Sequence, residues 1–217
     1  YKNNLLDSSY YEFLPNGSIS VEGYFDNGLK NGEWATFTEE GKLFSIGFYL
    51  NDYKDGVWKY FYKSGYLKSE GIYSTGFKNG QWIFFYENKN IDEIGSYYND
   101  LKDGLWGRFY SNGQLKQEEL YNKGKLISIS EYYLENGKIA DKGNFKNGKG
   151  NGFDYYENGK IFSIKNYNNG FLNGKSIFYY SNGKIAEEGS YKNNIKVGVW
   201  KKYNKRGLEI SQSIYEK

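Results

Sequence analysis

Tryptophan is the residue type in this sequence whose spacing most strongly suggests binding chemistry. Four tryptophans recur at intervals of 24 residues and a fifth comes later: Trp34, Trp58, Trp82, Trp106 and Trp200. Regularly spaced indole rings can stack on sugar rings or on choline-like cations. The row is interrupted, because Ser130, Gly152 and Ser176 stand where the interval would place tryptophans. A row that bound a repeating polymer would be broken there, so a structural role for the indoles is favoured.

Residues suited to catalysis or metal binding are few. Cys, His and Met are absent, which excludes disulfides, thiolate or imidazole ligands and nucleophiles that depend on Cys or His. Asp55 and Asp103 lie in Asp-Gly turns, and the neighbours Glu118 and Glu119 point to opposite faces of a predicted strand. The segment GKGNG at 148–152 lacks the spacing and following helix of a phosphate-binding loop. We therefore expect no catalytic residue, no metal and no cofactor, and we predict that the protein is not an enzyme.

The composition limits the function further. The chain has 217 residues, and its charged residues are scattered along it with a formal net charge of only +3. Such a distribution does not give the cationic surface that nucleic acid requires, so no nucleic-acid partner is expected. Aromatic residues are abundant, with 25 Tyr, 15 Phe and 5 Trp, which predicts a core built from rings. No apolar run reaches membrane-spanning length.

A period of 24 residues organises the whole sequence, and the step is shorter by two residues once, in the turn near 145–152. Relative to the reference Gly65, the position four residues earlier is aromatic in every copy: Phe13, Phe37, Phe61, Phe85, Phe109, Tyr133, Tyr155, Tyr179 and Tyr203. A second row is also aromatic throughout: Tyr1, Phe25, Tyr49, Tyr73, Tyr97, Tyr121, Phe145, Tyr167, Tyr191 and Tyr215. We predict about nine tandem repeats in a single domain, residues 1–217. Because the pattern is in phase at both ends, we expect the chain either to be a piece of a longer array or to lack its native flanks.

Each repeat is predicted to form a β-hairpin. Short apolar stretches alternate with Asn-Gly or Asp-Gly turns, whose residues tolerate positive φ, and no helical periodicity is present. Successive hairpins predict an all-β fold, namely an elongated, twisted, single-layer antiparallel β-meander. Such a sheet has no globular core, so rings stacked along neighbouring strands must stabilise it.

A two-residue turn at Ser64-Gly65 would set the register of the strands. It predicts these opposed pairs: Trp58 with Gly71, Tyr62 with Leu67, and Lys59 with Glu70. The same register opposes Trp34 to Gly47 and Trp82 to Gly95. A large ring that lies over a glycine of the adjacent strand covers backbone that would otherwise be exposed.

The aromatic residues divide into structural and candidate binding positions. Rings that recur in every copy suit a stacking ladder, and we assign a structural role to Trp34, Trp58, Trp82, Trp106, Phe37, Phe61, Phe85 and Phe109. Positions that vary between copies suit recognition. One such row, predicted on the tryptophan face, supplies the candidate binding surface Tyr60, Phe84, Arg108, Tyr132 and Phe178, and also contains Thr36, Asp154 and Lys202. The alternative for this row is a solvated face with incidental rings.

The phrases YNDLKDGLWGRFYSNGQL (98–115) and YKNNIKVGVWKKYNKRG (191–207) resemble MORN repeats, most closely their bacterial, antitoxin-like variant. The resemblance extends over the whole chain and implies an elongated β-meander used for protein contact and scaffolding. Some bacterial members resemble the antitoxin in toxin–antitoxin or immunity pairs, and some eukaryotic relatives are linked to membrane lipids. Because the eukaryotic repeat often carries a His that this chain lacks, a membrane-lipid partner is not favoured. Choline-binding or glucan-binding repeats are a second, weaker resemblance.

These observations predict a non-enzymatic protein-interaction scaffold or adaptor, either a bacterial surface protein or an immunity or antitoxin-type partner. Its expected partner is another protein. The alternative is a glycan-binding or cell-wall-binding module that uses exposed aromatic rings. A bacterial surface, periplasmic or secreted location is favoured over a cytoplasmic one.

Overall fold

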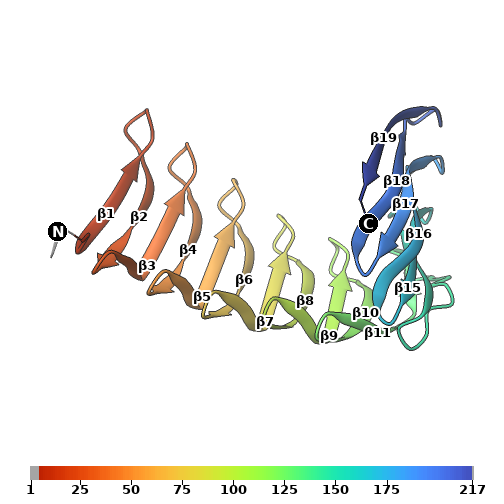
Figure 1. Cartoon of the computed structure of the whole chain (residues 1–217), viewed down its shortest axis with the longest axis horizontal. Helices are drawn as coiled ribbons and strands as arrows, with labels where there is room; N and C mark the ends of the chain where they lie inside the picture. Colours follow the sequence, from red (N-terminus) through yellow and green to blue (C-terminus); the bar gives the residue numbers. More distant parts are fainter. Residues whose placement is uncertain (1–4, 217) are drawn as a thin grey trace. The chain divides into compact units, whose positions relative to one another are not determined.

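The computed structural model describes residues 5–216 of the chain. Between these residues every regular element is a β-strand, and no helix long and apolar enough to cross a membrane occurs there. Strands follow one another as antiparallel hairpins in sequence order (Figure 1). The all-β meander predicted from the 24-residue period is therefore confirmed. Tyr1, the first member of the second aromatic row, lies outside the described residues.

The chain divides into two compact units. Unit 1 contains the residues up to Gly104 together with Ser111–Gly113, and unit 2 contains Leu105–Tyr110 together with the residues from Gln114 onward. Strand β9 (Leu101–Phe109) includes the boundary between them. The single repeat domain over residues 1–217 stays a prediction.

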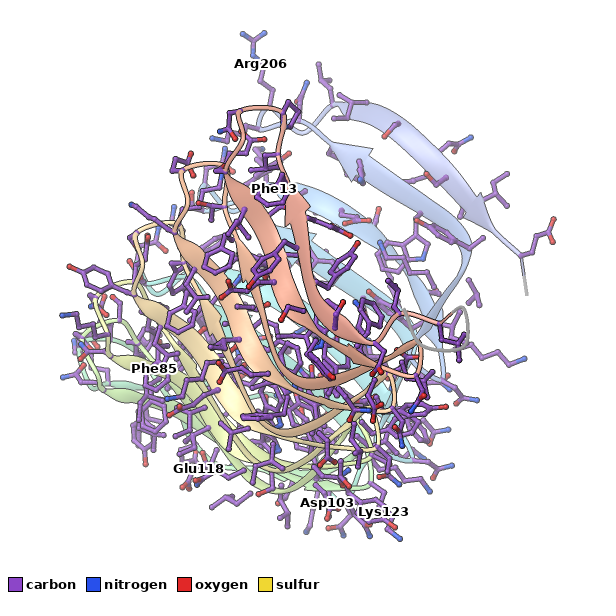
Figure 2. The ribbon with its side chains drawn as sticks, turned by 90° about the vertical axis from the view of Figure 1, so that its left-hand side faces the viewer. Phe13, Phe85, Asp103, Glu118, Lys123 and Arg206 are labelled. Atoms are coloured by element: carbon purple, nitrogen blue, oxygen red, sulfur yellow. The ribbon has the colours of Figure 1, made fainter. Side chains whose placement is uncertain are left out.

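Unit 1 is a regular meander in which each strand pairs antiparallel with the next. Side chains stand on both faces of its sheet (Figure 2). Its complete strands are β1 (Ser8–Phe13), β2 (Ile19–Asp26), β3 (Leu29–Phe37), β4 (Leu43–Leu50), β5 (Tyr53–Phe61), β6 (Leu67–Ser74), β7 (Phe77–Phe85) and β8 (Ile91–Tyr98).

Unit 2 is less regular. It contains β10 (Leu115–Asn122), β11 (Lys125–Ile129), β12 (Tyr132–Tyr133), β13 (Ile139–Ala140), β14 (Gly150–Tyr155), β15 (Ile161–Asn168), β16 (Phe171–Tyr179), β17 (Ile185–Lys192), β18 (Ile195–Tyr203) and β19 (Glu209–Tyr215). Here β10 pairs with β11, β12 pairs with β13, and β14 through β19 pair in sequence as a sheet of their own. Pairing is therefore interrupted between Ile129 and Gly150, where one continuous sheet was expected.

The interruption coincides with the two-residue deletion. After the turn at Asn147 and Gly148, strand β14 begins at Gly150 with a positive φ of 109°. Asn144 and Asn151 replace part of the missing ladder, because each backbone N–H donates to the other's side-chain carbonyl oxygen, at 2.9 and 2.7 Å. Lys146 and Lys149 still close a two-residue turn across Asn147 and Gly148, and beyond it the two asparagine side chains satisfy backbone N–H groups that a regular ladder would pair.

The turn at Ser64-Gly65 has a different geometry from the one predicted. Tyr62 C=O accepts a hydrogen bond from Gly65 N–H, and Tyr62 N–H donates to Tyr66 C=O. Gly65 has a φ of +89°, so the loop contains three residues and ends in a glycine bulge. As a result Phe61 pairs with Leu67, and the predicted pairing of Tyr62 with Leu67 is wrong. Two-residue turns with two positive φ angles occur at the other end of the hairpins, for example at Asn27-Gly28.

The predicted opposition of tryptophan and glycine is confirmed, but the ring leans the other way. Trp58 is the Cα partner of Gly71 on β6 and also of Gly47 on β4. A Cβ built on Gly47 would lie 2.3 Å from the Trp58 ring, whereas one on Gly71 would meet the Trp82 ring at 2.2 Å. Each of these indoles therefore covers the glycine of the preceding strand. The sequence register alone could not select between the two neighbouring strands.

The same indoles have partners on their other sides. Trp58 Nε1 donates to Phe48 C=O at 2.9 Å, and the Tyr49 ring meets the indole edge-on with ring centroids 5.1 Å apart. Lys54 Nζ lies 4.1 Å from the ring centroid. A lysine lies over Trp34, Trp82 and Trp200 in the same way. Such cation–π contacts contribute about 0.5–2 kcal/mol each.

The rings predicted to have a structural role are buried or half-buried. Trp34, Trp58, Trp82 and Trp106 are between 0 and 2 % exposed. The phenylalanine row is half-buried, at Phe37, Phe61, Phe85 and Phe109. The first three of these pair with an aliphatic residue on the next strand, respectively Leu43, Leu67 and Ile91. The predicted pair of Lys59 and Glu70 is also present, with Nζ and a carboxylate oxygen 3.8 Å apart.

Replacing a covered glycine should destabilise unit 1. In Gly71→Ala the added Cβ would lie 2.2 Å from Trp82, so the ring must move, and we expect a loss of about 1–3 kcal/mol in the free energy of unfolding measured in urea. Gly152→Ala is the matched control, since its Cβ would meet its nearest neighbour at 3.6 Å without positive φ. Equal effects of the two substitutions would contradict the covering role.

Tryptophan fluorescence should report the same burial in the unmodified protein. All five indoles are 2 % exposed or less, namely Trp34, Trp58, Trp82, Trp106 and Trp200. We therefore expect blue-shifted emission and little quenching by acrylamide. Emission should move to the red and become quenchable only on unfolding in urea. Strong quenching of the native protein would mean that the rings are open to solvent.

Candidate functional site

The five candidate binding residues are distributed over both units. Tyr60 and Phe84 belong to unit 1, whereas Arg108, Tyr132 and Phe178 belong to unit 2. The surroundings of these residues are therefore described unit by unit.

In unit 1 the two candidate rings pack on the indoles of the ladder. Tyr60 stacks on Trp58 with ring centroids 6.1 Å apart, and Phe84 stacks on Trp82 at 6.0 Å. Lys54 Nζ donates to the Tyr60 hydroxyl at 2.7 Å. Burial, followed by the hydrogen bond with Tyr73, raises the pKa of Tyr60 far above its ordinary value. Both rings are half-buried, so they contribute to packing, and Tyr60 also lines an open pocket of about 310 Å³.

Unit 2 brings Arg108 into a compact cluster of charged side chains. Its Nη1 lies 3.1 Å from Glu119 Oε1 and 3.0 Å from Asp154 Oδ1. Lys165 Nζ is 2.7 Å from the other oxygen of Asp154. These four residues, Arg108, Glu119, Asp154 and Lys165, are called the charged cluster below. Ser163 also donates to Asp154, at 3.0 Å.

The charged cluster contains two acids and two bases and is poorly exposed, since the side chain of Asp154 is only 13 % exposed. Burial by itself raises the pKa of Asp154, but the charges of Arg108 and Lys165 outweigh it and hold that pKa far below its ordinary value. Burial and the neighbouring Glu119 raise the pKa of Tyr121, whose hydroxyl donates to Glu119 at 2.8 Å. Asp154 is therefore ionised at neutral pH, and the charges of Arg108 and Lys165 balance it within the cluster.

The cluster occupies the region where the tryptophan row is interrupted. Ser176 stands in a tryptophan position, and its Cα partner Lys165 stands where regular copies have glycine. Glu119 likewise replaces the glycine that the residue at Ser130 would cover. Without an indole above it, the glycine position can carry a long side chain. Loss of tryptophan is thus accompanied by gain of charge in two of the three interrupted copies, since Gly143 is kept where Gly152 replaces the indole. This is a sequence signal that the predicted register did not show.

An open groove of about 610 Å³ lies over the charged cluster within unit 2. It is lined by Arg108, Tyr110, Lys116, Tyr132, Asp154, Tyr155, Tyr156, Glu157, Asn158, Phe162, Lys165 and Ser181. Of the predicted residues, Arg108 and Tyr132 contribute to it and Phe178 does not. Tyr132 is fully buried, and its hydroxyl accepts a hydrogen bond from Tyr155 N–H at 3.2 Å. Tyr132 therefore supports the groove from beneath.

A second surface lies on the face of unit 1 opposite the indoles. Phe48, Val57 and Ile72 are 51, 51 and 44 % exposed. Val57 and Ile72 are directly paired on β5 and β6. We call Phe48, Val57 and Ile72 the apolar strip. The candidate binding residues were predicted on the other face, from the aromatic rows, whereas alternation with Trp58 puts Val57 on this face.

No side-chain arrangement of the described residues suggests metal chemistry. Across residues 5–216 there is no group of three or more acidic side chains that could hold a metal ion. The charged cluster pairs each acid with a base, so its arrangement suits packing and polar recognition.

Acid should weaken the charged cluster, and Asp154→Asn should remove that dependence. Because the pKa of Asp154 is lowered on folding, its stabilisation is fully present above the ordinary value of 3.8 and is lost as the pH falls below it. At pH 7 the substitution takes the carboxylate away from Lys165 and from Arg108, which keeps its pair with Glu119, and we expect unit 2 to lose about 3 kcal/mol in urea unfolding. Glu131→Gln, which breaks the exposed pair with Lys142, is the control and should change stability by no more than about 0.5 kcal/mol.

Comparison with known proteins supports the assignment of the repeats. The family model for the MORN repeat variant matches seven segments, which together cover more than half of the chain: 30–51, 54–74, 78–100, 102–123, 126–147, 150–169 and 172–193. No curated protein matches the chain. The matched segments follow the hairpins described above, including the shortened copy. The chain belongs to the MORN repeat variant family.

Proposed function

We propose that this protein is a non-enzymatic scaffold that binds a protein partner through the apolar strip of unit 1. The observation that carries this proposal is the half-exposure of Phe48, Val57 and Ile72 on one open face of the sheet. Groups of exposed apolar side chains on a regular sheet are typical of protein interfaces, because burying them removes apolar surface from water. MORN repeats are generally associated with scaffold roles that bind proteins or membranes, which agrees with such a surface.

The proposed biological setting is based on the resemblance of the repeats to the bacterial, antitoxin-like variant of MORN repeats. We propose a bacterial protein at the cell surface, in the periplasm or secreted, and as the specific case one that is itself the immunity or antitoxin-type member of a pair. The near-neutral formal charge of +3 gives little attraction to anionic lipid, so a protein partner is favoured over a membrane. The complete reading frame and its neighbouring genes test the setting, through a secretion signal upstream or a toxin gene beside it.

A glycan partner is the second candidate, and the groove of unit 2 is the observation that favours it. The groove combines aromatic residues such as Tyr155, Tyr156 and Phe162 with polar groups such as Asn158, a combination that suits sugar rings. The tryptophans do not supply this surface, because they are at most 2 % exposed. A glycan partner would therefore bind through the groove and its tyrosines.

Affinity capture with matched variants separates the two candidates. We expect the wild-type chain to retain a protein from bacterial or host extracts, and we expect the purified partner to bind at least tenfold more weakly to Val57→Asp and Ile72→Asp. Each aspartate would place a charge in the contact that must be desolvated. Ser74→Asp, at an exposed strand end, adds the same charge outside the strip and should bind normally.

Calorimetry with the purified partner gives the affinities, and fluorescence confirms that each variant is folded. Retention on peptidoglycan or polysaccharide alone, unaffected by Val57→Asp and Ile72→Asp, would contradict the proposal and favour the glycan partner.

A further inference from the structure

An acidic pocket lies beside the apolar strip on the same face of unit 1. It measures about 200 Å³ and is lined by Tyr11, Glu22, Gly23, Tyr24, Glu33 and Ala35. Glu33 also lines the adjoining groove of about 340 Å³, which contains Phe48 and Val57 of the apolar strip. The two hollows therefore share a wall, and one ligand can occupy both.

The repeat itself shows what is missing from this pocket. Along β4 to β6, Lys59 is the Cα partner of both Ile46 and Glu70, and its ammonium group pairs with Glu70. Ala35 is the counterpart of Lys59 one period earlier, and it is the Cα partner of Glu22. The other neighbour of Glu22 is Tyr11. Glu22 is the counterpart of Glu70 two periods earlier, so Tyr11 stands in the place from which Lys59 pairs with Glu70. Ala35, on the other side, offers only a methyl group, so neither strand neighbour supplies a cation to Glu22.

The acidic side chains of the pocket have no cationic partner elsewhere in residues 5–216. No ion pair of Glu22 or Glu33 occurs among these residues, whereas Glu70 has one. Small Ala35, only 4 % exposed, forms the floor, and the rings of Tyr11 and Tyr24 are 51 and 43 % exposed at the sides. Two carboxylates between open aromatic rings attract a cation by charge and by the negative faces of the rings.

We propose that this pocket receives an arginine or lysine side chain of the protein partner, while an apolar side chain of the same partner segment fills the groove at Phe48 and Val57. Arginine fits better than lysine, because its planar group can hydrogen-bond carboxylate and stack on tyrosine at once. In an extended segment, side chains two residues apart lie on the same face. The partner therefore presents a cation and an apolar residue in alternate positions. The inference rests on the proposed protein-binding function.

A short peptide tests the pocket directly with the full chain. The probe is an N-acetylated, C-amidated pentapeptide with the order Ser-Phe-Thr-Arg-Ser, and its control carries citrulline, which keeps the shape of arginine without its charge. NMR titration of the labelled protein should give an affinity for the arginine peptide at least tenfold above that for the control. The difference should shrink as salt is raised. Equal binding of the two peptides, or binding of choline or phosphatidylcholine vesicles in place of the peptide, would overturn the proposal.

Variants that copy one repeat into another provide the matched controls. The double substitution Glu22→Gln with Glu33→Gln should lower the affinity for the arginine peptide at least tenfold, while Glu70→Gln should leave that affinity unchanged. Ala35→Lys places a lysine directly opposite Glu22, in the row position at which Lys59 is accepted by the sheet, so it should supply the cation internally and abolish binding in a folded protein. The converse change, Lys59→Ala, should create a second site at Glu70. Unaltered peptide binding by Ala35→Lys would contradict the inference.

The captured partner distinguishes failure of this inference from failure of the proposed function. If Val57→Asp releases the partner but the double glutamine variant does not, the apolar strip is an interface and the cation pocket is wrong. If neither change affects the partner, the proposed function is wrong as well. Loss of partner binding in Val57→Asp and in the double glutamine variant supports the apolar strip as an interface and the cation pocket as well.

Discussion

The packing of an indole ring on a glycine of the preceding strand is the contact on which the regular part of this fold depends. An open sheet has no interior, so its backbone must be covered by side chains of its own strands. Trp58 shows how completely one residue does this. Its ring covers Gly47, its Nε1 bonds Phe48 C=O, and Tyr49 and Lys54 contact its edge and face. Repeating this arrangement every 24 residues gives unit 1 its buried layer.

Where the contact is lost, the chemistry of the sheet changes. Ser176 in place of tryptophan accompanies Lys165 in place of glycine, and Lys165 then pairs with Asp154 beneath an open groove. Buried ion pairs carry a desolvation penalty and are often no more stabilising than apolar packing. The position of these ion pairs beneath an open groove therefore suits recognition or local geometry better than a gain in stability.

Periodicity was sufficient to predict most of unit 1. It gave the strands, the opposition of Trp58 to Gly71 and the pair of Lys59 with Glu70. It could not give the turn at Gly65, because glycine with positive φ suits both a two-residue turn and a three-residue loop with a bulge. Nor could it show which neighbour an indole covers. The contact of Arg108 with Asp154 joins residues 46 positions apart, and it depends on the irregular pairing that follows the deletion, which local pattern does not determine.

Because the indoles cover glycines of the strand before them and not of the strand after them, the array has a direction along the chain. The glycine of a hairpin is covered by the tryptophan of the hairpin that follows it in the chain, and not by that of the hairpin before it. Removing a copy from the C-terminal side of unit 1 would expose the backbone of a glycine to solvent. Removing a copy from the N-terminal side would leave a tryptophan ring without the glycine that it covers. The two edges of such a sheet are therefore chemically different, and a repeat taken out of context differs in stability according to which neighbour it keeps.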